Sequence, residues 1–250
     1  MRRRPLRWIM VGVVLAVGLY FVFDVISLQY LESRGAAELA RTMTAEEAKI
    51  DLGDIPFLPG FITGKLSRAE IDVRGASGSG GFRVQLLNAR MSNVRFSWRE
   101  MLSLSRSVFS TRTKVKMGEP IGLVEIGQSD LEDFLQRHIP DVGTVRISSA
   151  GVEVRFLSKR LKTGIEPTPD DLTEPARYLP RVTDRHIVLS LLGMGQVPER
   201  FASSARRVEQ VIDLPAIPEG LRSDVRLGAG VITVEASGRE LELTVGEGEE

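Results

Sequence analysis

The sequence predicts an α+β protein in which an N-terminal transmembrane helix is followed by a curved, mostly antiparallel sheet with a few packing helices. One long apolar run near the N-terminus is the first observation behind this prediction. In most later segments apolar and polar residues alternate with a period of two, which is typical of strands with one buried face. Only short stretches return to helical spacing, so the helices are few.

Residues 8–28 form the apolar run and are expected to be a transmembrane signal anchor. At ~1.5 Å per residue, a helix of this length is about 30 Å long, which matches the hydrocarbon core of a bilayer. No charge occurs between Trp8 and Phe23, and we expect Asp24 to reach interfacial water near the far end. Four arginines and no acid in residues 1–7 place that segment in the cytoplasm and the rest of the chain outside.

Two alternatives to an uncleaved anchor remain open. A cleaved signal peptide needs small residues at its cleavage site, and Gly35 and Ala37 have the right mutual spacing but lie far beyond the apolar run. A buried core helix is the weaker alternative, because charge returns in every later segment and none could surround this helix. We therefore expect a single-pass protein of the cell membrane, with its main domain outside the cytoplasm.

Residues 29–48 keep a roughly helical spacing and are expected to form a connecting helix against the domain, which covers residues 49–242. Prolines and glycines then punctuate the chain up to Gly64 and favour a loop over a long helix. Four large apolar side chains lie in this predicted loop: Phe57, Leu58, Phe61 and Ile62. Such side chains either pack into a core or contact lipid, and both outcomes are open here.

The first half of the domain is predicted to contain strands over residues 65–73, 82–96, 109–117 and 121–126. A glycine-rich turn joins the first two into a hairpin, and a shift of the alternation near residues 87–91 indicates a bulge. A helix is predicted to begin at the S-x-x-E capping box of residues 129–132 and to end before Pro140.

The second half is predicted to contain further strands over residues 145–147, 152–156, 186–192, 221–227, 231–236 and 241–245. Residues 198–212 have helical spacing. Residues 157–184 are polar and contain four prolines, so we expect a long loop that leaves the domain. Residues 243–250 are expected to form an acidic tail.

Residues that enzymes and metal sites usually need are scarce in this chain. It has no cysteine and only two histidines, His138 and His186, so thiol chemistry and a His-rich metal site are not expected. It contains no nucleophile elbow and no phosphate loop, and Asp170 and Asp171 are adjacent on the proline-rich loop, where such a pair is usually at the surface. We expect no enzyme activity, no metal or other cofactor and no nucleic-acid partner.

Positive charge is concentrated in one part of the domain. Residues 65–116 carry eleven Lys or Arg and three acids, and a region of one sign attracts anionic partners. Solvent faces of strands, where charge alternates with core residues, explain the same excess equally well.

Three segments resemble a known family. They read GDIPFLPGFITGKL at residues 53–66, LPAIPEGLRSDVRL at residues 214–227 and GVITVEASGREL at residues 230–241. Together with the arginine-led anchor they are similar to the LmeA-like phospholipid-binding family of actinobacterial cell envelopes. The resemblance covers about residues 29–241, and residues 157–184 depart from the family pattern.

The resemblance implies a tubular lipid-binding-like fold that binds anionic phospholipid, phosphatidylinositol in particular, and supports assembly or maintenance of envelope lipids and lipoglycans. A lipid carrier needs an apolar cavity between sheet and helices, and a basic rim for the headgroup. We expect the four apolar loop residues to contact acyl chains. The candidate rim is Arg112, Lys114 and Lys116, with Arg90, Arg95 and Arg99 nearby.

Two other functions are open. A non-enzymatic scaffolding domain for envelope enzymes predicts a solid core without a tunnel. An envelope hydrolase or transferase requires clustered acids in a polar cleft.

Overall fold

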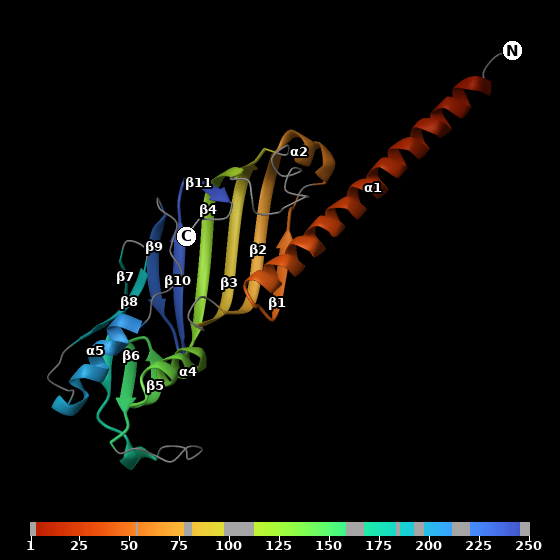
Figure 1. The fold of residues 1–250 in the computed structure, drawn as a ribbon. Coiled ribbons are helices and arrows are strands. Elements are labelled where there is room, and N and C mark those ends of the chain that lie inside the picture. The colour runs from red at the N-terminus through yellow and green to blue at the C-terminus, as the bar shows by residue number, and fades with distance from the viewer. Residues whose placement is uncertain are drawn as a thin grey trace.

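The computed structural model describes residues 4–53, 55–77, 82–97, 113–158, 168–183, 186–192, 198–211 and 221–245. It has an N-terminal apolar helix, two open antiparallel sheets and a few further helices, which confirms the predicted α+β class. Figure 1 shows the first helix projecting from one end of the longer sheet, with the smaller sheet at the opposite end. The single curved sheet that we predicted is therefore two sheets.

The apolar run and the connecting segment form one uninterrupted helix, α1 (Arg4–Thr42). Much of its described apolar surface is exposed, with Leu19 at 70% and Phe23 at 62%, so α1 is not a core helix of this domain. In the described part of the chain it is the one helix long and apolar enough, by length and composition, to cross a membrane.

The predicted connecting helix to residue 48 is too long. Thr44 adopts a left-handed backbone with φ of 46°, which turns the chain away from the helix axis. Residues from Glu47 onward then pair with the sheet, because their apolar and polar side chains alternate. Strand β1 (Glu47–Asp51) therefore replaces the last part of the predicted helix.

The longer sheet has seven antiparallel strands in the order β1-β2-β3-β4-β10-β9. β4 is long enough to pair with β10 along its second half and with β11 along its first half. Besides β1, its strands are β2 (Lys65–Ser77), β3 (Arg83–Arg95), β4 (Thr113–Gly127), β9 (Arg222–Leu227), β10 (Val231–Ser237) and β11 (Glu240–Val245). The predicted bulge lies a few residues late, between Arg90 and Arg95, where Asn93 has φ of 47°.

The smaller sheet has the order β5-β6-β7-β8. Its strands are β5 (Val142–Ser148), β6 (Gly151–Phe156), β7 (Ala176–Thr183) and β8 (His186–Leu191). The polar excursion predicted over residues 157–184 is thus wrong for its last part, which forms β7. Prolines concealed this strand, but β6 pairs with β7 only as far as Tyr178, so Pro180 lies where no N–H is needed on that side.

Short helices connect and cover the sheets: α4 (Gln128–His138), η1 (Pro169–Asp171), η3 (Glu199–Phe201) and α5 (Ala202–Val211). The predicted capping box at residues 129–132 does not form, since α4 begins one residue earlier behind Gly127 and no side chain caps it. Glu132 instead accepts a hydrogen bond from the backbone N–H of Val145 at 2.8 Å, and thereby ties α4 to β5.

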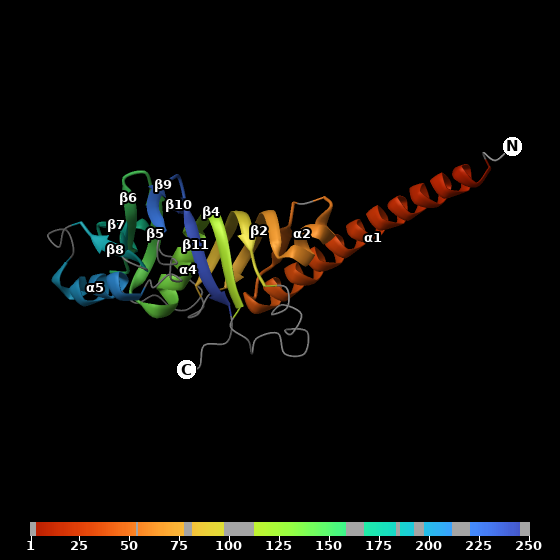
Figure 2. The same ribbon diagram turned by 90° about the horizontal axis from the view of Figure 1, so that it is seen from above.

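Two hydrophobic clusters hold the fold together at opposite ends of the longer sheet. The distal cluster joins α4 and α5 to both sheets; Phe134 of α4 meets Phe82 edge-on with ring centroids 5.0 Å apart. The proximal cluster joins α1 to the other end of the longer sheet, and Leu28, Leu66 and Met117 are buried in it. From above, α1 leaves the domain at one end, and the smaller sheet with α5 lies at the other (Figure 2).

Candidate functional site

One face of the longer sheet is apolar across five neighbouring strands. Directly opposed residues of antiparallel strands point to the same face, so the register defines rows across the sheet. One row runs Val73, Leu87, Val124, Val234, Val225, and the next runs Ile71, Ala89, Gly122, Ala236. We call the second one the small-residue row.

The small-residue row lies between the two hydrophobic clusters and is not fully covered. Ile71 and Ala89 are half-buried. A Cβ atom built on Gly122 would come within 4 Å of only one atom outside its chain neighbours, the carbonyl oxygen of Ala236 at 4.0 Å. Among the described residues, therefore, no side chain covers the middle of this apolar face, a surface that suits a flexible hydrocarbon chain.

The opposite face of the sheet is polar and internally paired. Glu70 accepts hydrogen bonds from Arg68, from Arg90 at 2.7 Å and from Asn88 at 3.3 Å. The bonds from Arg68 and Arg90 lower the pKa of Glu70 from an ordinary 4.5 to about 2. Arg90, one of the nearby basic candidates, is thus part of an ion-pair network on the polar face.

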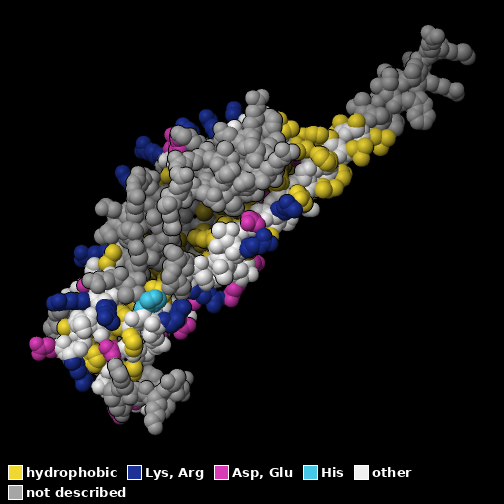
Figure 3. Space-filling view, viewed as in Figure 1, with side chains coloured by type: hydrophobic (Ala, Val, Ile, Leu, Met, Phe, Trp, Pro, Cys, Tyr) yellow, Lys and Arg dark blue, Asp and Glu magenta, His cyan; other side chains and the backbone are white. Residues whose placement is uncertain are grey.

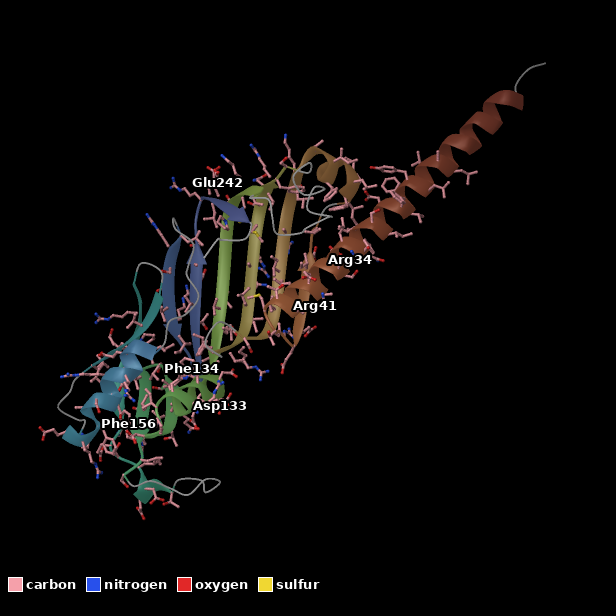
Figure 4. All side chains as sticks on the ribbon, viewed as in Figure 1. Arg34, Arg41, Asp133, Phe134, Phe156 and Glu242 are labelled. Carbon is pink, nitrogen blue, oxygen red and sulfur yellow. The ribbon has the colours of Figure 1, made fainter. Side chains whose placement is uncertain are left out.

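Polar residues line two of the surface pockets in the described part of the chain. The larger, about 340 Å³, lies against Asp133, Gln136 and Arg137 of α4; Figure 4 labels Asp133. The smaller, about 110 Å³, is lined by Lys49 and three acids, Asp51, Glu70 and Asp72. The enclosed apolar cavity expected of a lipid carrier remains a prediction.

The predicted apolar loop contains a short helix, α2 (Phe57–Thr63), which begins behind Pro56 and ends at Gly64 in the left-handed conformation with φ of 68°. Its first N–H groups would lack acceptors, because Pro56 offers no capping side chain. Asp24 of α1 supplies both acceptors, at 2.8 Å from the N–H of Phe57 and 2.6 Å from that of Leu58.

Asp24 is fully buried in this contact, so our expectation that it faces interfacial water is wrong. A carboxylate at a helix N-terminus is favoured by both the free N–H groups and the helix dipole. A second side chain of α1 makes a similar contact, since Glu32 accepts a hydrogen bond from the N–H of Leu52 at 2.9 Å. The two contacts fix α1 to the domain.

The four apolar residues singled out in the sequence separate into two groups. Phe57 is fully buried, and Leu58 and Phe61 are half-buried beside it in the proximal cluster, where the rings of Phe57 and Phe61 lie 5.2 Å apart. Ile62 remains outside at 59% exposure. Sequence analysis missed Ile55, which is 69% exposed just before α2.

Basic side chains form a second row at the same end of the sheet. Lys65 lies directly opposite Arg95, and Arg95 lies opposite Lys116. We call these three exposed residues the basic row. Lys116 pairs with Glu242 at 3.1 Å, and neither of the others forms an ion pair with a described residue.

The basic row points away from the proximal cluster. Leu66, Val94 and Met117, which alternate with its three members along the strands, are all buried in that cluster. In Figure 3, Lys and Arg side chains gather along the upper edge of the molecule, and hydrophobic side chains along the described outer part of α1.

The remaining basic candidates are only partly described. Arg112 and Arg99 lie outside the described residues. Lys114 belongs to β4, two residues before Lys116, but its side chain lies outside the described part.

Polar residues considered for chemistry have structural partners. Asp171 is only 6% exposed, contrary to our expectation for the acidic pair, and accepts the hydroxyl hydrogen of Thr168 at 2.6 Å. The Nδ1 atom of His138 lies 2.9 Å from the carbonyl oxygen of Phe134. Among the described residues no group of three or more His, Cys, Asp or Glu is placed to hold a metal ion.

Comparison with known proteins gives one match. The model of the family described as LmeA-like phospholipid-binding matches residues 22–237, from the end of the apolar run through the last residue of β10. No curated protein and no solved structure matches the chain. Because the match covers most of the chain, this protein belongs to the LmeA-like phospholipid-binding family.

Proposed function

We propose that this protein is a membrane-anchored, extracytoplasmic protein that holds anionic phospholipid against the apolar face of its longer sheet. Family membership supports phospholipid as the ligand class. The observation that carries the proposal is the apolar face itself, which is continuous over five strands, with no described side chain filling the space above Gly122. A solid scaffolding domain would fill that space with side chains.

The anchor in this proposal is α1. Its exposed apolar surface has no covering partner among the described residues, and water would solvate such a surface poorly. The arginines of residues 1–7 favour a cytoplasmic N-terminus, so the two sheets would lie on the outer side of the cell membrane.

The proposed headgroup site uses positive charge at the proximal end of the sheet. Lys116, together with Lys114 and Arg112, would attract a phosphate through charge-assisted hydrogen bonds. Phosphatidylinositol is the headgroup that we propose, and support of envelope lipid or lipoglycan assembly is the proposed role. Phe57, Leu58, Phe61 and Ile62 would border the acyl chains where these enter the domain, although only Ile62 is largely exposed.

The proposed activity is binding without covalent chemistry. Its test is native mass spectrometry of the full-length protein released from detergent after exposure to an equimolar mixture of phosphatidylinositol and phosphatidylcholine. We expect a complex with one phospholipid, enriched in phosphatidylinositol. Recovery of the protein without lipid would contradict lipid binding, and equal recovery of the two lipids would contradict the headgroup assignment.

A further inference from the structure

The proximal end of the longer sheet combines exposed apolar and basic side chains beside the helix that leads to the membrane. We infer that this end is a docking surface that rests on the anionic bilayer from which α1 emerges. The surface consists of Ile55, Ile62 and the basic row. The inference relies on the proposed anchoring by α1 and adds a fixed orientation of the domain on the membrane.

The orientation follows from the contact between α1 and α2. Asp24 lies four residues before the end of the predicted span at Leu28, or about 6 Å along the axis at ~1.5 Å per residue. Its carboxylate binds the first two N–H groups of α2, so α2 lies at the depth where the bilayer ends. Because Glu32 provides a second attachment, α1 does not act as a flexible tether.

The apolar part of the surface continues the apolar surface of α1. Ile55, just before α2, is 69% exposed, and Ile62, in the last turn of α2, is 59% exposed. Ile26 of α1, near Asp24, is 58% exposed. Large apolar side chains at this depth would meet the boundary between headgroups and acyl chains, where such residues are favoured. A protein partner is not needed to explain their exposure.

The basic part of the surface begins with Lys65, the first residue of β2 after α2, and continues across β3 and β4 with Arg95 and Lys116. Like charges directly opposite each other on neighbouring strands destabilise a sheet, and Lys65, Arg95 and Lys116 form two such pairs in succession. Among the described residues, Glu242 is the acid that pairs with this row, and it offsets only part of the charge. Anionic headgroups would offset the rest, since basic residues near a membrane are attracted within about one Debye length.

Docking would also place the apolar face of the sheet in contact with the membrane. The proximal cluster lies between α2 and the small-residue row on that face. An acyl chain could therefore pass from the bilayer along the strands without crossing water. The partner of this surface is accordingly the lipid bilayer. Membrane helices tilt by about 20° on average, and such a tilt of α1 lets the end of the sheet approach the bilayer.

The chain has no cysteine, so single cysteines can be introduced for fluorescent labelling of the full-length protein. Ile62→Cys reports on the proposed surface, Leu19→Cys on the anchor, and Leu192→Cys on a side chain that is 53% exposed at the end of β8. Each variant is placed in nanodiscs of phosphatidylglycerol and phosphatidylcholine that carry lipids with a shallow or a deep spin-label quencher.

We expect the label at position 62 to be quenched several times more strongly than the label at position 192, and by the shallow quencher most. Equal, weak quenching at positions 62 and 192 with strong quenching at position 19 would overturn the docking surface and leave the anchor intact. Absence of quenching at position 19 would overturn the anchoring and the docking together.

Charge reversal tests the basic row in the background of Ile62→Cys. Replacing Lys65, Arg95 and Lys116 with Glu should reduce quenching at position 62 severalfold in anionic nanodiscs. The matched control replaces three exposed arginines of β7 and α5 with Glu: Arg181, Arg206 and Arg207. This variant has the same change of net charge. An equal loss of quenching in both triple variants would overturn the role of the basic row.

Discussion

Replacing Asp24 with alanine removes both acceptors that hold the first turn of α2. The side chain is fully buried and accepts two N–H hydrogen bonds, at 2.8 and 2.6 Å. Two hydrogen bonds to a charged group, at ~1.5 kcal/mol each, stabilise the contact between α1 and α2 by about 3 kcal/mol. Since ~1.4 kcal/mol corresponds to a factor of ten, local opening of α2 should become about 100-fold more frequent.

Hydrogen–deuterium exchange of the full-length protein in detergent measures this opening directly. In the Asp24→Ala variant, the amides of Phe57 and Leu58 should lose about two orders of magnitude of protection, while those of α4 remain unchanged. Asp24→Asn retains one oxygen acceptor and should lose protection by an intermediate amount.

The control is Ser33→Ala, which removes an exposed hydroxyl that hydrogen-bonds within α1 and does not contact α2. It should leave exchange in α2 unchanged. If Asp24→Ala exchanged at the wild-type rate in α2, the carboxylate would not be the element that joins the two helices.

Two further predictions concern the polar face and the smaller sheet. Because the pKa of Glu70 is lowered to about 2, its ion pairs with Arg68 and Arg90 stabilise the folded state fully above pH 4.5, and this contribution is lost as the pH falls toward 2. Glu70→Gln should therefore lower the free energy of unfolding at pH 7 by about 1 kcal/mol, which is the upper range for exposed ion pairs. It should also flatten the pH dependence of that free energy between pH 4.5 and pH 2. A pH dependence like that of the wild type would contradict this. Tyr178→Phe removes the hydrogen bond that the buried hydroxyl donates to the carbonyl of Ala205 at 3.2 Å. The free energy of unfolding, measured by urea denaturation, should fall by about 1 kcal/mol. An unchanged free energy of unfolding would show that the bond contributes nothing to stability.

Local sequence patterns predicted the strands well because alternation is a local property. The strands predicted over residues 145–147, 152–156, 221–227 and 231–236 are confirmed. The helix predicted over residues 198–212 is confirmed as far as Val211, although its first turn is a 3₁₀-helix. Errors occurred where a distant residue decides the structure. The helix α2 depends on Asp24, which lies 33 positions before Phe57 in the sequence. The predicted capping box does not form, because Glu132 binds the backbone of β5.

The candidate site could be predicted only in part. Alternation indicated an apolar face, but its continuity and the lack of a described side chain above Gly122 depend on the register of several strands. An isolated glycine within an apolar strand was the available signal, since it often marks close approach of another group. Arg95 and Lys116 were among the basic candidates and Lys65 was not; their arrangement as one row was missed because the three residues are far apart in sequence and adjacent only through pairing.

Gly122, over which no described side chain lies, gives the most direct test of phospholipid binding on the apolar face. A phospholipid with a photoactivatable acyl chain is added to the full-length protein, and crosslinks are mapped by mass spectrometry. The wild type should crosslink within β3 and β4, and Gly122→Phe should fill the space and reduce the yield severalfold. Ile121→Phe is the matched control, because this neighbouring residue is 45% exposed on the opposite face and should leave the yield unchanged.

Circular dichroism of both variants confirms that the sheet is retained, and Ala89→Leu provides an independent obstruction from the adjacent strand. Phospholipid binding on the apolar face predicts loss of crosslinking with Gly122→Phe and Ala89→Leu and wild-type crosslinking with Ile121→Phe. Undiminished crosslinking in folded Gly122→Phe and Ala89→Leu proteins would contradict it, because the acyl chain would then lie elsewhere.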